Sequence, residues 1–317
     1  MDKMLSTFQI FNLGYFVYLI LAIGVVLALV LLLRKLTDKN VLVSKVAIIS
    51  AIGLFCILEF VGRLIGTKNI RLGDQMPFEL WDIFAVMSIV MFFVKKPGLK
   101  KFGYLIIAPV SLYSMIFVPS MYCAFSTISL AILSFYLLQA LLISNAILNM
   151  LWDEEELEKK DILNASITYL IIVSCAHLLN IFFRFTAIGV HANYMGTMGE
   201  EYDTIIGFIY KLIPVPFVCI LPMVAVLVGI EFLLILPFDL IKTKKKNQSE
   251  IEELIALGNL KAQAEYRKNH KSSGSQILVR SETKASPKTD KNTVSTQKSG
   301  FVETTKQVKV NNEKNEK

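Results

Sequence analysis

Seven long apolar segments fill the first 240 residues of the chain, and each is long enough to cross a lipid bilayer. They lie at about 9–33, 41–65, 76–94, 102–118, 124–150, 161–187 and 205–238. A membrane-spanning helix needs about 20 mainly apolar residues, and a hydrophobic content of 54% agrees with several such helices. The pattern therefore predicts an all-α fold, a polytopic membrane helix bundle of about seven transmembrane helices.

The lysine and arginine residues of the short loops are concentrated on one side of this predicted bundle. The cytoplasmic side of membrane proteins is enriched in both residue types, so we expect the N-terminus outside and the C-terminus in the cytoplasm. A composition rich in Lys, Asn, Ile and Phe but poor in Trp is typical of a bacterium with a single plasma membrane, where we expect this protein. The enriched loops contain Arg34, Lys35, Lys39, Lys45, Lys95, Lys96, Lys100, Lys101, Lys159, Lys160, Lys242 and Lys244 to Lys246.

The chain changes character after the predicted transmembrane domain, residues 1–241. Residues 242–268 begin with a basic cluster and continue with an amphipathic pattern, which predicts a juxtamembrane helix on the anionic membrane surface. Residues 269–317 are polar and almost free of aromatic residues, which predicts a disordered basic cytoplasmic tail. This tail is a candidate contact for a cytoplasmic protein partner. It carries no nucleic-acid motif, so we do not expect nucleic acid as a partner.

Cysteine and histidine residues are sparse, and no cofactor or metal is expected. The four cysteines fall inside or beside the predicted spans without the C-x-x-C spacing of a metal site, which is typical of small core residues. The chain also lacks a P-loop, a G-x-G-x-x-G segment, an H-E-x-x-H helix and a G-x-S-x-G turn.

Charged side chains within the spans point to a polar site in the outer half of the membrane. An uncompensated charge at the bilayer centre costs at least about 2.5 kcal/mol, so such groups should face protein or water. Glu59 and Arg63 lie four residues apart on one helix face, close enough to pair. Glu79 and Asp82 share one face of the next span, so either a cation lies between them or one is protonated.

A polar stripe on the sixth predicted span adds to this site. His177, Asn180 and Arg184 follow the helical spacing i, i+3 and i+7. Arg184 is the expected partner of a carboxylate, while Gln139 and His177 are expected nearer the middle of the membrane. The outer loop 189–203 is placed to cover the group.

Two interpretations of these residues stay open. In the first, the charges form a buried ion network that fixes helix register. In the second, they line an outer-facing polar cavity that binds a lipid headgroup or a polar solute. Three acids against two arginines leave one carboxylate without a cation, which favours the cavity.

Four short motifs in a fixed order resemble a known family. They are Leu58-Glu59-Phe60, the segment M-P-F-E-L-W-D from Met76 to Asp82, Asn193-Tyr194-Met195, and the segment I-P-V-P-F from Ile213 to Phe217. Over roughly residues 10–240 the chain is similar to the YwaF family of bacterial membrane proteins, which is related to the eukaryotic transmembrane protein 164 acyltransferases. The resemblance implies a helical membrane fold and an ancestral acyl-transfer centre.

The departures from this family pattern bear on whether the protein is an enzyme. Trp81 stands where the resemblance places the nucleophilic cysteine, and Glu79 and Gln139 stand where it places histidines. Thioester chemistry needs a thiolate and a base that activates it, so we expect no acyl transfer, although an enzymatic role is not excluded. The positions that carry over as cavity or scaffold residues are Glu59, Asp82, Asn193 and Tyr194.

Three functions follow as hypotheses. The first is binding of a lipid headgroup or polar solute, with membrane lipids as partners. The second is a membrane subunit for solute uptake that works with a separate energising partner, because Pro214, Pro216 and Pro222 predict a broken last helix. The third is a divergent lipid acyltransferase or hydrolase that uses Glu79 and Asp82 as an acid/base pair.

Overall fold

A computed structural model describes residues 8–66, 76–153, 155–186, 192–198 and 205–277. These residues are helical and include no strand, which confirms the all-α prediction. The helices are α1 (Leu13–Leu33), α2 (Asp38–Gly66), α4 (Leu80–Val94), α5 (Pro97–Phe102), α6 (Ala108–Ile116), α7 (Leu130–Trp152), α8 (Lys159–Phe185), α9 (Ile205–Leu212) and α10 (Leu221–Ile277). Short π or 3-10 segments are η2 (Gly103–Ile107), η3 (Ser120–Ala124), η4 (Tyr194–Gly196) and η5 (Val218–Ile220).

Six helical stretches of the described chain are long and apolar enough to cross a membrane. The third predicted span is the shorter helix α4, of 15 residues. It begins at Leu80 rather than at residue 76 because Glu79 is its N-cap, and the Glu79 backbone N–H donates to Oδ2 of Asp82 at 3.2 Å. The multi-pass helical architecture is thus confirmed, while the predicted start of this span is wrong.

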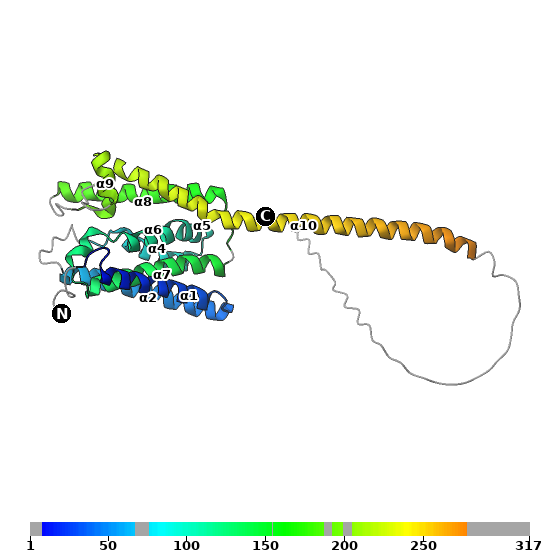
Figure 1. Cartoon of the computed structure of the whole chain (residues 1–317), viewed down its shortest axis with the longest axis horizontal. Helices are drawn as coiled ribbons and strands as arrows, with labels where there is room; N and C mark the ends of the chain where they lie inside the picture. Colours follow the sequence, from blue (N-terminus) through cyan, green and yellow to red (C-terminus); the bar gives the residue numbers. More distant parts are fainter. Residues whose placement is uncertain (1–7, 67–75, 154, 187–191, 199–204, 278–317) are drawn as a thin grey trace, which may run out of the picture. The chain divides into compact units, whose positions relative to one another are not determined.

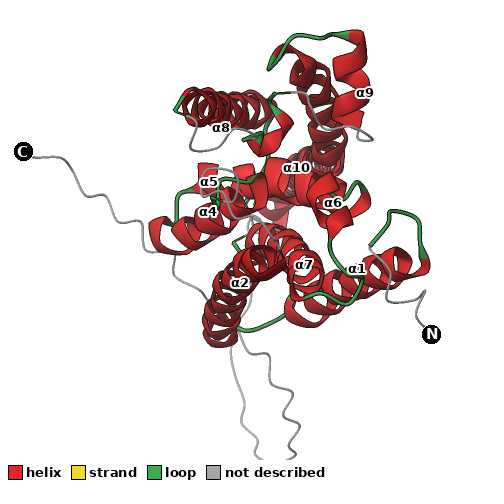
Figure 2. Cartoon of the chain, turned by 90° about the vertical axis from the view of Figure 1, so that its left-hand side faces the viewer, coloured by secondary structure: helices red, strands yellow, loops and turns green. Residues whose placement is uncertain are grey.

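Helix α7 lies at the centre of the transmembrane bundle. It packs against α1, α2, α4 and α6, and the end-on view shows these helices around it (Figure 2). Most of its side chains are buried, whereas α1 and α2 direct many large apolar side chains outward, as lipid-facing helices do. Helices α4, α5 and α6 lie between α7 and α8 (Figure 1).

Two spans depart from a regular α-helix. The fourth begins at Pro97, earlier than the predicted residue 102, and joins α5 to α6 through the π segment η2. The last span is interrupted between α9 and α10, where Phe217 adopts a φ of 66°. Pro214 and Pro216 lie in this interruption, and each lacks a backbone donor. The prediction of a broken last helix is confirmed.

A network of ion pairs closes the lysine-rich end of the bundle. Asp153, which follows α7, lies 3.0 Å from Nζ of Lys45 and 2.9 Å from Nζ of Lys100. Burial alone would raise the pKa of Asp153, but the hydrogen bonds and charges of the two lysines lower it below the ordinary aspartate value. The network ties α2 and α5 to the end of α7.

We expect this network to stabilise the bundle above the ordinary aspartate pKa of about 4 and to lose its effect in acid. A lowered folded-state pKa means that stability falls as the pH drops through that pKa. Because the Asp153 side chain is 26% exposed, the contribution should be below about 1 kcal/mol. Thermal unfolding of wild type and Asp153→Asn between pH 3 and 7 should show wild type losing more stability in acid. Parallel curves would contradict the assignment.

Candidate functional site

The candidate site is built around Arg63, which binds two carboxylates. Its Nε lies 2.7 Å from Oε1 of Glu59, one turn earlier on α2, and its guanidinium nitrogen Nη2 lies 3.0 Å from Oδ2 of Asp82 on α4. All three side chains are at most 3% exposed. The predicted pairing of Glu59 with Arg63 is confirmed, and the cation beside Asp82 is Arg63.

Two further side chains join this triad, and neither could be predicted from the sequence. The hydroxyl of Tyr122, in η3, donates to Oε1 of Glu59. The thiol of Cys56, one turn before Glu59 on α2, donates to Oδ1 of Asp82 at 3.8 Å. Tyr122 lies between two spans and Cys56 reads as an ordinary core residue, so only the tertiary fold brings them to the charges.

Trp81 forms one wall of the site. Its ring centroid lies 5.9 Å from that of Tyr122 and 5.4 Å from that of Phe135 on α7. The Arg63 guanidinium lies 5.9 Å from the Trp81 ring centroid, within the range of a cation–π contact. The position that the sequence resemblance gives to a nucleophile is thus occupied by a buried indole that packs on the triad.

The polar residues of α8 hold the loop that follows that helix. Nδ2 of Asn180 donates to the backbone carbonyl of Tyr194 at 3.0 Å and to the Thr197 hydroxyl at 2.8 Å. Oδ1 of Asn180 accepts the backbone N–H of Tyr194 at 2.9 Å. Nε of Arg184 donates to the carbonyl of Ala192 at 2.8 Å. These contacts fix the loop segment 192–198 against α8.

The same loop segment is joined to the start of α4. The Tyr194 hydroxyl accepts the backbone N–H of Met76 at 3.0 Å, and Oε2 of Glu79 accepts the backbone N–H of Met195 at 3.3 Å. The ring of Tyr194 also packs edge-on to Phe78. Glu79 therefore connects the loop to α4, the helix that carries Asp82 three residues further along the chain. The rest of the predicted covering loop, 189–191 and 199–203, lies outside the described residues.

Several buried polar atoms on α2, α4 and α7 have no hydrogen-bond partner within the described part of the chain. They are Oε2 of Glu59, Nε1 of Trp81 and both amide atoms of Gln139. These side chains are 0%, 4% and 1% exposed. Gln139 lies one turn of α7 beyond Phe135, which contacts Trp81. A buried polar atom without a partner costs about 1–3 kcal/mol, so this interior is suited to an ordered water molecule or a bound polar group.

The remaining predicted residues lie outside the triad. The His177 ring packs against Phe217 of the interrupted last span, with centroids 5.2 Å apart. Oδ1 of Asn193 accepts the backbone N–H of Met198 at 2.8 Å. A further buried acid, Glu231 on α10, accepts the Ser166 hydroxyl of α8 at 3.0 Å. Among the described residues, no group of three or more His, Cys, Asp and Glu side chains is placed to hold a metal ion.

A family model described as the TMEM164 family matches residues 4–235, most of the transmembrane region. No curated protein matches the chain. No solved structure matches it.

Proposed function

The chain belongs to the TMEM164 family, and from this premise we propose that it binds a lipid headgroup or polar solute between its transmembrane helices without catalysing acyl transfer. The binding site in this proposal is the interior around Trp81, and its polar groups are the Glu59–Arg63–Asp82 triad and Gln139, one turn beyond Phe135 on α7. In this proposal the site lies in the outer half of a plasma membrane, with the N-terminus outside, and the excess of lysine and arginine in the loops of the opposite side supports that orientation.

The observation that supports this proposal best is the set of unpaired polar atoms contributed by α2, α4 and α7. The set offers acceptors, Oε2 of Glu59 and Oε1 of Gln139, and donors, Nε1 of Trp81 and Nε2 of Gln139, in a buried environment. A purely structural role does not require such atoms, because apolar side chains of similar size would pack there at a lower free-energy cost. A bound group with both donors and acceptors, such as a glycerol hydroxyl, an amine or a phosphate, would satisfy them.

The geometry gives less support to transfer or hydrolysis chemistry. An indole stands at the position that the YwaF resemblance assigns to the nucleophile. The Cys56 thiol donates to Asp82, and the charge of Arg63 is already shared between two carboxylates. Glu79 and Asp82 do not form an isolated acid/base pair, because Glu79 holds the loop backbone and Asp82 binds Arg63.

Replacing Gln139 by Leu should separate binding from stability. We expect Gln139→Leu to lose a small molecule or lipid that the wild type retains during gentle purification, because the amide is its hydrogen-bonding group. The free energy of unfolding of the ligand-free variant should rise by about 1–2 kcal/mol, since an unpaired amide is removed from the core. Mass spectrometry of co-purified molecules and thermal unfolding measure the two effects.

A matched control for this experiment is Ser144→Ala on the same helix. The Ser144 hydroxyl is buried but already donates to the carbonyl of Ala140 at 2.7 Å, so its removal should leave retention unchanged. A phospholipid that is specific to wild type supports lipid binding, and a water-soluble compound supports solute uptake. The same bulk lipid in wild type and Gln139→Leu would overturn the proposal and leave the triad as a structural ion network.

A further inference from the structure

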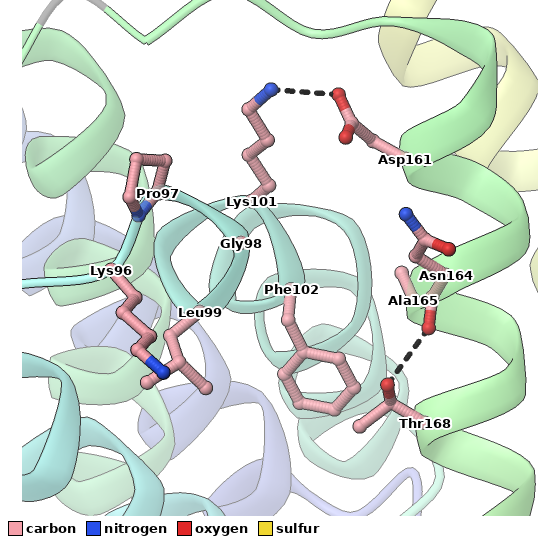
Figure 3. Close-up of a pocket in the computed structure, with 10 residues that line it drawn as sticks. All are labelled: Lys96, Pro97, Gly98, Leu99, Lys101, Phe102, Asp161, Asn164, Ala165 and Thr168. Carbon is pink, nitrogen blue, oxygen red and sulfur yellow. Dashed lines mark hydrogen bonds and ion pairs between the residues drawn. The ribbon is translucent and has the colours of Figure 1, made fainter.

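A second candidate site lies at the lysine-rich end of the bundle, away from the Trp81 interior. A cavity of about 440 Å³ opens between α5 and α8. Its walls are partly apolar, formed by Pro97, Leu99, Phe102 and Ala165 (Figure 3). The cavity is large enough for a polar headgroup and the first carbons attached to it.

The polar side chains of this cavity leave a net positive charge. Lys101 and Asp161 neutralise each other, with Nζ 2.9 Å from Oδ2. The Asp161 carboxylate also accepts the backbone N–H of Glu158 at 2.8 Å, as part of the N-cap of α8. Lys96 lines the same cavity and has no ion pair or hydrogen bond to the residues that the structure describes. Its ammonium group is therefore free to bind an anion.

The position of the cavity favours an amphipathic anion over a soluble one. Lys96 lies between the end of α4 at Val94 and the start of α5 at Pro97, at the level where spans leave the membrane. The Leu99 side chain and the Phe102 ring line the cavity together with its polar residues (Figure 3). A basic pocket between transmembrane helices at the membrane surface suits a charged lipid headgroup.

We propose that this cavity binds the headgroup of an anionic phospholipid, with the phosphate at Lys96 and the glycerol and first acyl carbons against Phe102 and Ala165. The Asn164 amide and Thr168 hydroxyl, which also line the cavity, stand on α8 at the side of the headgroup. A zwitterionic lipid carries its own cation beside the phosphate and gains less from the Lys96 ammonium.

The first test compares Lys96→Gln with Lys95→Gln. Both lysines are exposed and adjacent, but only Lys96 lines the cavity. Each protein is reconstituted in nanodiscs of equal parts phosphatidylglycerol and phosphatidylcholine. The phosphatidylglycerol that stays bound when the protein is released from the nanodisc is measured by native mass spectrometry. We expect Lys96→Gln to reduce it about fivefold and Lys95→Gln to leave it near the wild-type level. Equal loss in both variants would mean that surface charge in general, and not the cavity, attracts the lipid, and it would overturn the proposal.

A second test changes the volume of the cavity and not its charge. Ala165→Phe fills the space beside Phe102, and Leu163→Phe, on the exposed side of the same helix, is its control. Ala165→Phe should displace phosphatidylglycerol, whereas Leu163→Phe should not. If millimolar inorganic phosphate displaces phosphatidylglycerol and a competing lipid does not, the site binds a free anion. Retention that is unchanged in both Lys96→Gln and Ala165→Phe would exclude the cavity as a lipid site.

Discussion

Replacing Arg63 by Met should destabilise the protein more than any other single change that removes a charge. Arg63 is 1% exposed and pairs with both Glu59 and Asp82. Removing it leaves two carboxylates in a membrane-embedded core without their cation. Breaking a buried pair in this way costs about 3–5 kcal/mol, so we expect a large loss of folded protein and a large fall in the thermal unfolding midpoint.

Two comparisons make this prediction specific to the triad. The triple change Arg63→Met, Glu59→Gln and Asp82→Asn should recover much of the lost stability, because no charge then remains without a partner. The surface change Lys45→Met should cost below about 1 kcal/mol, since its pair with Asp153 is partly exposed. If Arg63→Met were as mild as Lys45→Met, the triad would not be buried and paired as described.

Helix geometry explains which parts of the triad could be predicted from the sequence. Glu59 and Arg63 are four residues apart in one span, and any regular helix brings such residues together. Counting charges was less reliable. Three acids against two arginines suggested that each arginine takes one carboxylate, yet Arg63 alone binds two of them.

Other parts of the site depend on contacts between distant segments, which the sequence does not encode locally. Tyr122 reaches Glu59 across the bundle from the loop before α7, and Cys56 meets Asp82 because α2 packs beside α4. The start of α4 was placed too early because hydropathy does not reveal that Glu79 acts as the N-cap. By contrast, the interruption after α9 was predictable, because Pro214 and Pro216 remove two backbone donors within three residues.

The role of the polar stripe on α8 was predicted only in part. Asn180 and Arg184 share a face with His177, as their spacing required, but they bind the backbone of the loop segment 192–198. Polar side chains that hold a loop and side chains that bind a ligand have the same sequence signature. Only the presence of partners separates Asn180, which is fully bonded, from Gln139, which has none among the described residues.

The second large effect is expected from Gly62→Ala, at the contact of α2 with α7. A Cβ at Gly62 would lie 2.6 Å from the backbone nitrogen of Ala131 and 2.8 Å from its Cα. These atoms belong to the backbone of α7 and cannot rotate away, so the two helices must separate. This separation should lower the free energy of unfolding by about 1–3 kcal/mol. It also shifts Arg63, the next residue on α2.

Gly53→Ala is the matched control, because it lies on the same helix and its added Cβ meets no atom within 4 Å. Alanine is about 1 kcal/mol better than glycine within a helix, so Gly53→Ala should stabilise the protein or leave it unchanged, and the two variants should move the unfolding midpoint in opposite directions. Adding Ala131→Gly should not rescue Gly62→Ala, because the closest atoms are backbone atoms that glycine keeps. Rescue would mean that α2 approaches the Ala131 side chain and not its backbone, and that Arg63 is held at a different distance from Asp82.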